Sequence, residues 1–304
     1  MDKAINMSIT EQKTWISVLL CTYNDGKYIA ETIESILNQT YPYFEFIIIN
    51  DGSTDNTGEI IDAFRDPRIK HIKRLNHGLT KSLNFGITQC QYNWIARIDG
   101  DDVALPNRFE KQLEYINSNV AAIGTQYKHI DSEGNIIANI SLPLSHKNII
   151  RRGITGATMF NHPSVLINKK LLNQVGDYDE HIDAAEDLDL WLKLSHYGRL
   201  INVDIPLMLY RMHENKISIY KRETQYTNAQ VAILKFRSKI HKNLTDFEYS
   251  RIRKKLEKSS FFHIGKILNS KSNTAKGFEL KFINLAFRIN QILINIFIKK
   301  ITNE

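Results

Sequence analysis

The chain has 304 residues, 42% of them hydrophobic and 24% charged, which suits one large globular domain plus an appendage. Its only cysteines, Cys21 and Cys90, exclude a disulfide framework and a cysteine-rich zinc site, and favour a reducing compartment. The residues before Trp15 include charged side chains and no apolar core, so we expect neither a secretory signal nor a membrane anchor there.

The formal net charge of +7 is unevenly distributed along the chain. Residues 214–304 contain 19 Lys and Arg against 7 Asp and Glu, whereas residues 1–213 carry a net charge of −5. The basic character therefore belongs to the C-terminal part. Such a segment can meet a nucleic acid, an anionic lipid surface or an acidic substrate.

From Trp15 onward, short β-rich apolar runs alternate with amphipathic stretches. The runs ISVLLCTY, FEFIIIN, RIKHIK and WIARID predict four strands, with a helix after each of the first three. Apolar runs without polar alternation, as at residues 47–49, are typical of strands covered on both faces. The first half is therefore predicted to be a doubly wound α/β fold with a mostly parallel sheet and flanking helices.

Polar residues follow these strands where ligands of such sheets bind, beyond the carboxyl ends. They occur at residues 22–25, 51–53 and 99–102. The last group contains three acids, whose mutual repulsion a divalent cation with oxygen preference, Mg²⁺ or Mn²⁺, would relieve. A calcium loop is a poor fit, since Val103 and Ala104 stand where an oxygen ligand and a tight-turn glycine are needed. Alternatively, Asp102 caps a following helix.

Two other groups on this edge have both functional and structural interpretations. Asp51 ends a strand, where it can bind a base or ribose, while Thr54 or Asp55 caps the next helix. Lys81 lies in the first turns of a helix that opens at Gly78, so it either faces a diphosphate or is solvated. No P-loop or dinucleotide fingerprint accompanies them, which disfavours kinases and dehydrogenases.

Beyond Glu110 we expect a helix to about Asn117, a strand in AAIGTQYKHI, and a less regular stretch before HPSVLIN. A short helix ended by Gly176 and the acidic helix AEDLDLWLKLSHYG follow. The acids of that helix either favour the helix dipole or supply a general base. A strand-like run then ends at His213, a residue that is either structural or a metal ligand.

The motifs in this order and spacing resemble family 2 glycosyltransferases of the GT-A fold, especially bacterial enzymes that assemble O-antigens, capsules and exopolysaccharides. The resemblance covers residues 16–213 and includes TYNDGKYI, NDGSTDNT, GLTKSLNFGI, ARIDGDD, HPSVLI, AEDLDLW and YRMH. It implies a GT-A catalytic domain over residues 1–215, with a nucleotide-binding part at about 15–102 and an acceptor part at about 103–215. Residues 216–304 are then a basic helical C-terminal extension.

The resemblance also implies roles for particular residues. A nucleotide would be bound by Thr22, Tyr23, Asn24, Asp51, which would read uracil, Lys81 and Asp99, the last near the ribose. A Mn²⁺ or Mg²⁺ ion would be bound by Asp101, with Asp99 and His213 as further ligands. Asp187 would be the general base, supported by Glu186. One departure is Leu83, which replaces a frequent arginine and leaves the diphosphate contact to Lys81.

The resulting hypothesis is an inverting, metal-dependent hexosyltransferase or N-acetylhexosaminyltransferase that moves a sugar from a UDP-sugar to a glycan, with a polyprenyl-diphosphate-linked oligosaccharide as the expected acceptor. A nucleotidyltransferase is a rival, but CTYNDGKYI poorly matches its glycine-rich basic loop. A nucleic-acid-binding protein is another, but the tail lacks an interleaved aromatic and basic RNA signature. We therefore expect no nucleic-acid partner.

The tail carries an apolar helical stripe over residues 276–300, interrupted by Lys281 and Arg288, so it is not expected to cross a bilayer. An amphipathic helix with a basic face can lie in the headgroup region, and RIRKK upstream adds positive charge. We therefore expect peripheral attachment to the cytoplasmic face of the bacterial plasma membrane. The alternatives are packing on the catalytic domain or on a second copy in a homo-oligomer.

Overall fold

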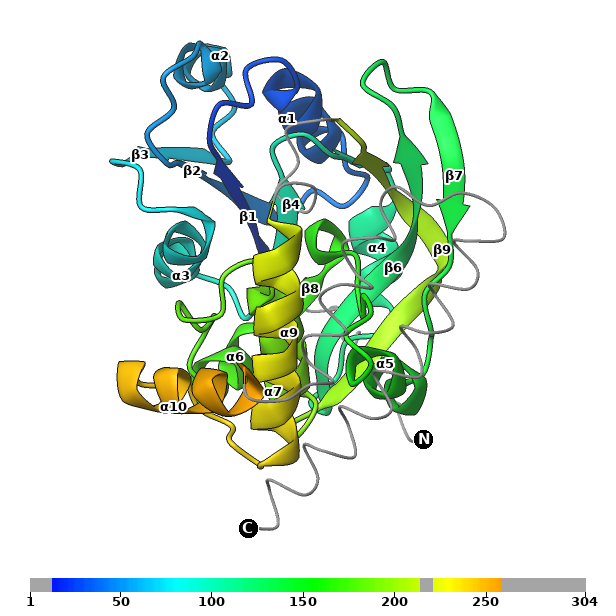
Figure 1. Ribbon diagram of the computed structural model, residues 1–304. Coiled ribbons are helices and arrows are strands. Elements are labelled where there is room, and N and C mark those ends of the chain that lie inside the picture. The colour runs from blue at the N-terminus through cyan, green and yellow to red at the C-terminus, as the bar shows by residue number, and fades with distance from the viewer. Residues whose placement is uncertain (1–12, 214–220, 258–304) are drawn as a thin grey trace, which may run out of the picture.

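A computed structural model describes residues 13–213 and 221–257, and shows one β-sheet covered by helices (Figure 1). The strands are β1 (Ile16–Thr22), β2 (Phe44–Asn50), β3 (Ile69–Lys73), β4 (Trp94–Asp99), β5 (Val103–Ala104), β6 (Val120–Ile130), β7 (Ile136–Ile140), β8 (Leu166–Asn168) and β9 (Arg199–Arg211). The helices are α1 (Ile29–Leu37), α2 (Thr57–Ala63), α3 (Leu79–Gln89), α4 (Arg108–Leu113), α5 (His146–Gly153), α6 (Lys169–Val175), α7 (Glu186–Leu194), α9 (Arg222–Arg237) and α10 (Asp246–Glu257), with a 3₁₀ turn η1 (His162–Ser164).

The strand order is β3-β2-β1-β4-β8-β6-β9-β5, with β7 paired to β6. The first four strands pair in parallel, as the apolar runs predict. Every residue of β1 is buried, because helices cover both of its faces. The second half is mixed: β8 runs antiparallel to β4 and β6, whereas β6 and β9 are parallel. The predicted α/β class with flanking helices is confirmed.

The stretch that looked irregular in sequence contains β7 and α5. Strand β7 is an edge strand whose residues are exposed or half-buried, so it lacks the apolar run that reveals a core strand. Helix α5 contributes only two buried residues, Ile149 and Gly153. Neither element therefore has a strong periodic signal in the sequence.

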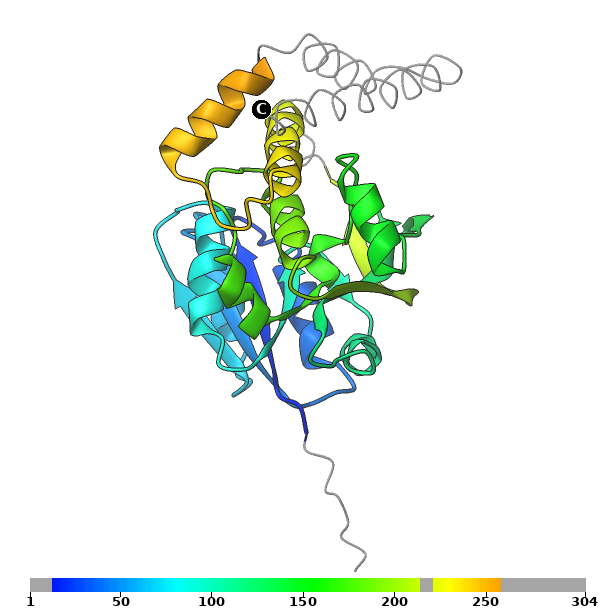
Figure 2. The same ribbon diagram turned by 90° about the horizontal axis from the view of Figure 1, so that it is seen from below.

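Helix α9 packs in the same hydrophobic core as the parallel strands. Tyr226, Val231 and Ile233 are buried in one cluster with Trp191 of α7 and with apolar side chains of β1 and β2. Figure 2 shows α9 and α10 on the side of the molecule toward which β1 points, opposite the start of that strand. The expected boundary near residue 215 and the tail at 276–304 lie outside the described residues, so the division into two regions remains a prediction.

Candidate active site

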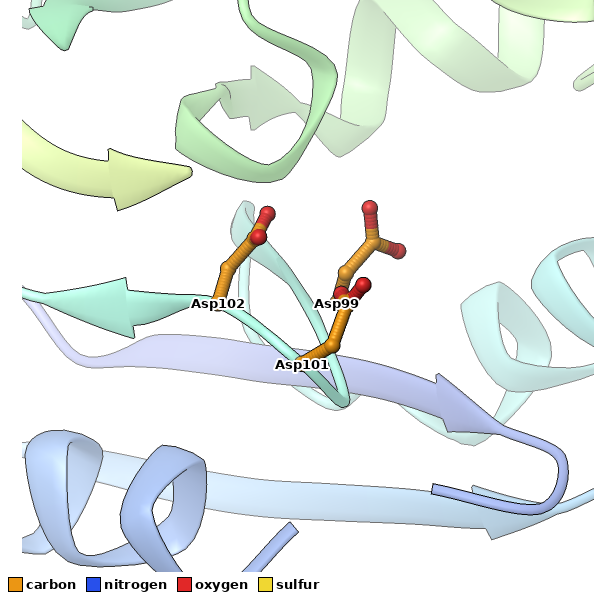
Figure 3. Close-up of side chains that lie close together, drawn as sticks. All are labelled: Asp99, Asp101 and Asp102. Carbon is orange, nitrogen blue, oxygen red and sulfur yellow. The ribbon is translucent and has the colours of Figure 1, made fainter. Parts of the chain in front are cut away.

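The carboxyl edge of the parallel strands gathers the acids that the sequence places after β4. Asp99, Asp101 and Asp102 each offer a carboxylate oxygen, and these oxygens lie within 4.8 Å of one another. Figure 3 shows the three carboxyl groups pointing to the same side of the turn. Two ligands of one Mg²⁺ ion lie at most about 4.2 Å apart, given metal–oxygen distances of about 2.1 Å. The set therefore fits an oxygen-preferring divalent cation after small side-chain movements.

His213 meets this cluster, although 112 residues separate it from Asp101 along the chain. Its Nε2 lies 2.7 Å from Asp101 Oδ2, close to the spacing of roughly 3 Å between adjacent ligands of an octahedral ion. The ring is also packed against Tyr28, at 5.4 Å between centroids. The structure therefore brings the three predicted metal ligands together around Asp101, which His213 contacts and which shares the acid cluster with Asp99.

Arg211 explains why β9 places His213 there. Its backbone N–H donates to Asp102 Oδ1 at 2.9 Å, and its Nε donates to the carbonyl oxygen of Asp101 at 2.9 Å. The guanidinium also pairs with Glu31 of α1, and it is almost fully buried. Asp102 therefore fixes β9 against the turn.

Asp99 lies in a bidentate ion pair with Arg97, a buried residue of β4. A guanidinium presents a planar pair of donors that matches a carboxylate, so this pair fixes the orientation of Asp99. Sequence reasoning missed Arg97, although a charged residue within an otherwise apolar strand is a usable signal. Asp99 is a predicted metal ligand, and the guanidinium of Arg97 already balances the negative charge of its carboxylate.

Asp25, one of the polar residues that follow β1, is a second residue to which sequence reasoning gave no role. Its Oδ2 accepts a hydrogen bond from Thr22 Oγ1 at 2.6 Å and lies where a Cβ on Gly100 would clash with it. Burial, together with the charges of Asp101 and Asp99, raises the pKa of Asp25 to about 6. Asp25 is thus a fourth carboxyl beside the cluster, and glycine at position 100 is needed for this close approach.

The predicted nucleotide-binding residues lie on two adjoining loops. Asn24, with a left-handed φ of 58°, accepts from the Thr54 N–H at 2.8 Å and its own N–H donates to Ser53 Oγ at 3.0 Å. The Tyr23 ring is 47% exposed, which leaves a face for a ligand. The loop after β1 and the loop after β2 therefore form one continuous rim.

Asp51 is buried and holds the start of α3. Its Oδ1 accepts from the His77 N–H at 3.1 Å and from Ser82 Oγ at 2.6 Å, and its Oδ2 accepts from the Gly78 N–H at 2.8 Å. These bonds satisfy backbone donors at a helix N-terminus, which otherwise have no intrahelical partner. Lys81 is exposed in the first turn of α3. Leu83 is a buried core residue, so the absence of an arginine there has a packing reason.

Glu186 and Asp187 open α7 next to Arg97. Burial and then the charge of Asp187 raise the pKa of Glu186 to about 8, and Arg97 opposes this rise. The pKa of Asp187 is also raised, chiefly by burial, but its carboxylate accepts from the Leu188 N–H at 2.7 Å and Arg97 favours its charge. Paired acids with separated pKa values take different protonation states. Burial and the repulsion between the two carboxylates therefore favour one shared proton on this pair, while Arg97 and the Leu188 N–H support the charge of Asp187.

Replacing Glu186 with glutamine should change how stability depends on pH. Folding raises the pKa of Glu186 from 4.5 to about 8, so the folded chain keeps a proton that the unfolded chain releases. The stability from this proton is complete below pH 4.5 and is lost as pH rises toward 8. We expect the Tm of Glu186→Gln minus that of the parent protein to grow from pH 5 to 8 and then level off. A difference that stays constant would show that Glu186 is ionised throughout.

The mixed sheet, with parallel strands in its first half and helices on both faces, is the architecture of the GT-A glycosyltransferase fold. A model of the family described as "Glycosyl transferase family 2" matches residues 17–176. The chain belongs to glycosyltransferase family 2, and it is a glycosyltransferase.

Named relatives and solved structures agree with this assignment. The chain is 34% identical over 242 residues to the O-antigen biosynthesis glycosyltransferase WbnJ of Escherichia coli, covering 76% of this chain and 92% of the relative. The fold resembles residues 1–349 of S. aureus TarS in complex with UDP, with a TM-score of 0.59, 17% identity, and 94% and 90% of the two chains covered. It also resembles the mannosyltransferase PcManGT from Pyrobaculum calidifontis in complex with GDP-Man and Mn²⁺, with a TM-score of 0.56, 13% identity, and 92% and 86% covered.

Proposed function

We propose that this glycosyltransferase is inverting and metal-dependent, and that it transfers a sugar from a UDP-sugar to a hydroxyl of a glycan acceptor. The observation that carries the proposal is the position of Arg97, which pairs with Asp99 of the acid cluster and also acts electrostatically on Asp187. The acid cluster and the Glu186–Asp187 pair thus lie within electrostatic range of the same arginine, which supports their proposed roles. A donor diphosphate and an acceptor hydroxyl between them would be in reacting positions.

The donor is proposed to be a nucleotide sugar held along the rim of the sheet. TarS was solved with UDP and PcManGT with GDP-Man and Mn²⁺, which supports this class of donor. An ionised carboxylate has about four lone-pair sites, so Asp51, which already accepts three hydrogen bonds, retains one for the N–H of uracil. Tyr23 would stack on the base, and the N-terminus of α3 with Lys81 would face the diphosphate.

Asp101, His213 and Asp99 would hold a Mn²⁺ or Mg²⁺ ion. When bound, such a cation neutralises the charge that develops on the departing diphosphate. The chain's own contribution is to orient the ligands: Arg211 fixes the Asp101 backbone, and Arg97 fixes the Asp99 carboxylate. Asp99 would contact the ribose as well as the ion. Its ion pair with Arg97 is compatible with both contacts.

Asp187 would take the proton from the acceptor hydroxyl as that oxygen forms the new glycosidic bond. The bond from the sugar to the diphosphate breaks on the opposite face, so an α-linked donor would give a β-linked product. Glu186, whose pKa burial raises to about 8, would carry the proton of the pair and donate a hydrogen bond to the acceptor or to Asp187. Its Oε2 is buried and has no hydrogen-bond partner among the described residues, as expected of an atom that would bond to a bound acceptor.

The acceptor is proposed to be a lipid-linked oligosaccharide at the cytoplasmic face of the plasma membrane, because the relative WbnJ acts in O-antigen biosynthesis. No helix in the described part of the chain is long and apolar enough to span a bilayer.

If the basic amphipathic tail attaches the protein to the membrane, deleting residues 276–304 should abolish co-sedimentation with anionic vesicles. Neutral vesicles should bind neither protein. Undiminished binding by the shortened chain would contradict attachment through the tail.

A panel of nucleotide sugars tests the proposed donor. With Mn²⁺ present, one UDP-sugar should raise the Tm and be hydrolysed slowly, and the matching GDP-sugar should do neither. Release of UDP should stop when the metal is chelated. Equal responses to the UDP-sugar and the GDP-sugar would contradict the assignment of uracil, and turnover without metal would contradict the ion.

A further inference from the structure

The segment of residues 177–185, here called the acid-pair loop, connects α6 to α7 and delivers Glu186 and Asp187 to the site. Two of its residues, Asp177 and Ala184, have left-handed backbones with φ of 53° and 61°. Residues other than glycine are uncommon in this region and persist where the surrounding structure holds them. Ala184 lies three residues before Asp187. The conformation of this loop is therefore imposed by its contacts.

Lys235 of α9 supplies the most buried of these contacts. Its Nζ lies 2.8 Å from Asp179 Oδ2 in the loop and 2.7 Å from Asp189 Oδ1 on α7. All three side chains are at most 1% exposed. Asp189 follows Asp187 by two positions, which places it about 200° around the helix, on the face turned toward α9. One ammonium group thus ties the loop to the helix that begins with the acid pair.

Asn228, two turns earlier on α9, contacts the end of the loop nearest the acids. Its Nδ2 donates to the carbonyl oxygen of Asp183, the residue before Ala184, at 2.8 Å. Its Oδ1 accepts from the hydroxyl of Tyr249 on α10 at 2.8 Å. The Asp183 carboxylate also pairs with Lys221 at 2.8 Å. The strained residue is therefore held from the side of the C-terminal helices.

The other end of the loop is fixed by the segment between α9 and α10. Lys193 Nζ donates to the Asp177 carbonyl oxygen at 2.8 Å and to Asn243 Oδ1 at 2.6 Å. The Leu244 N–H donates to Asp179 Oδ2 at 2.9 Å. The middle of the loop and its end nearest the acids are thus bonded directly to residues that come after His213, and Asp177 is connected to Asn243 through Lys193 of α7.

We propose that α9 and α10 form a clamp on the acid-pair loop, in which Lys235 and Asn228 are positioning residues for the proton transfer at Asp187. This inference rests on the proposed role of Asp187 as the general base. Neither residue belongs to the acid cluster or the acid pair. The clamp fixes the distance between the base and the acceptor hydroxyl, and a displacement of about 1 Å can lower turnover by about 100-fold.

The variant Lys235→Met removes the central ion pair and should lower kcat at least about 30-fold, because the base is displaced. The KM of the UDP-sugar should stay within about twofold, since the nucleotide rim is untouched. Lys254→Met, at an exposed position of α10, is the matched control and should be unchanged. Lys235→Met leaves two buried carboxylates without one of their partners. Asn228→Ala removes only neutral hydrogen bonds, so it is measured alongside. It tests the clamp if Lys235→Met does not fold.

Combining each clamp substitution with Asp187→Asn separates positioning from loss of folded enzyme. Once the base is absent, loosening its support should lower residual turnover by less than about twofold further. A folded Asn228→Ala protein with unchanged kcat, or the same loss with and without Asp187, would overturn the clamp. If Asp187→Asn itself kept the turnover of the parent enzyme, the proposed function would fail first.

Discussion

Asp187→Asn is expected to lower kcat by about 1,000-fold while the affinity for the donor stays unchanged. General-base catalysis contributes about 10²–10⁴-fold, and asparagine keeps the size of the side chain but cannot accept the hydroxyl proton. The carboxylate also accepts from the Leu188 N–H, which the asparagine oxygen can still do, so α7 should begin normally. Steady-state transfer with saturating donor gives kcat, and calorimetric titration with UDP gives the affinity.

Asp204→Asn is a suitable control, since this acid of β9 is exposed and accepts a 3.4 Å hydrogen bond from Gln126 that an asparagine oxygen can also accept. It should retain parental turnover. Collapse of UDP affinity in Asp187→Asn would instead assign that residue to donor binding.

Asp101→Ala is the second substitution with a large expected effect. Removing the carboxylate that His213 contacts should weaken the apparent affinity for Mn²⁺ by at least about 100-fold, a loss that even outer-shell partners can cause. Transfer should then fall below detection at Mn²⁺ concentrations that saturate the parent enzyme. A titration of activity with Mn²⁺ measures the shift.

The fold should survive this change, because removing one of several neighbouring carboxylates relieves repulsion. Asp102→Ala provides the contrast within the same turn: it removes the oxygen that accepts from the Arg211 N–H, so this variant should lower the Tm more than Asp101→Ala does. Undiminished Mn²⁺ dependence in Asp101→Ala would remove Asp101 from the metal site.

The sequence predicted the half of the fold in which packing is simplest. Strands β1 and β2 are buried on both faces and therefore appear as unbroken apolar runs, and the acids after β4 follow from the position of the sheet edge. The edge strand β7 has no such pattern. The burial of helix α9 was not predicted for a different reason: it is buried around Asn228 and Lys235, so polar residues occupy positions that a sequence pattern assigns to solvent.

The sequence indicated which residues form the candidate site better than it indicated which of them contact one another. Asp101 and His213 follow from motif positions, but their contact depends on the pairing of β5 with β9. The ion pair of Arg97 with Asp99 and the burial of Asp25 beside Gly100 depend on side-chain geometry that spacing does not encode. Asp51 illustrates the same limit, because its role in holding α3 appears only once both loops are in place.

The central claim is that carboxylates at the edge of the sheet bind the ion that bridges protein and donor. Anomalous diffraction at the manganese edge, from crystals grown with UDP and Mn²⁺, tests it directly. The account predicts one strong peak at bonding distance, roughly 2.2 Å, from Asp101 and from a diphosphate oxygen. A manganese ion and nucleotide bound away from Asp99 and Asp101 would contradict it.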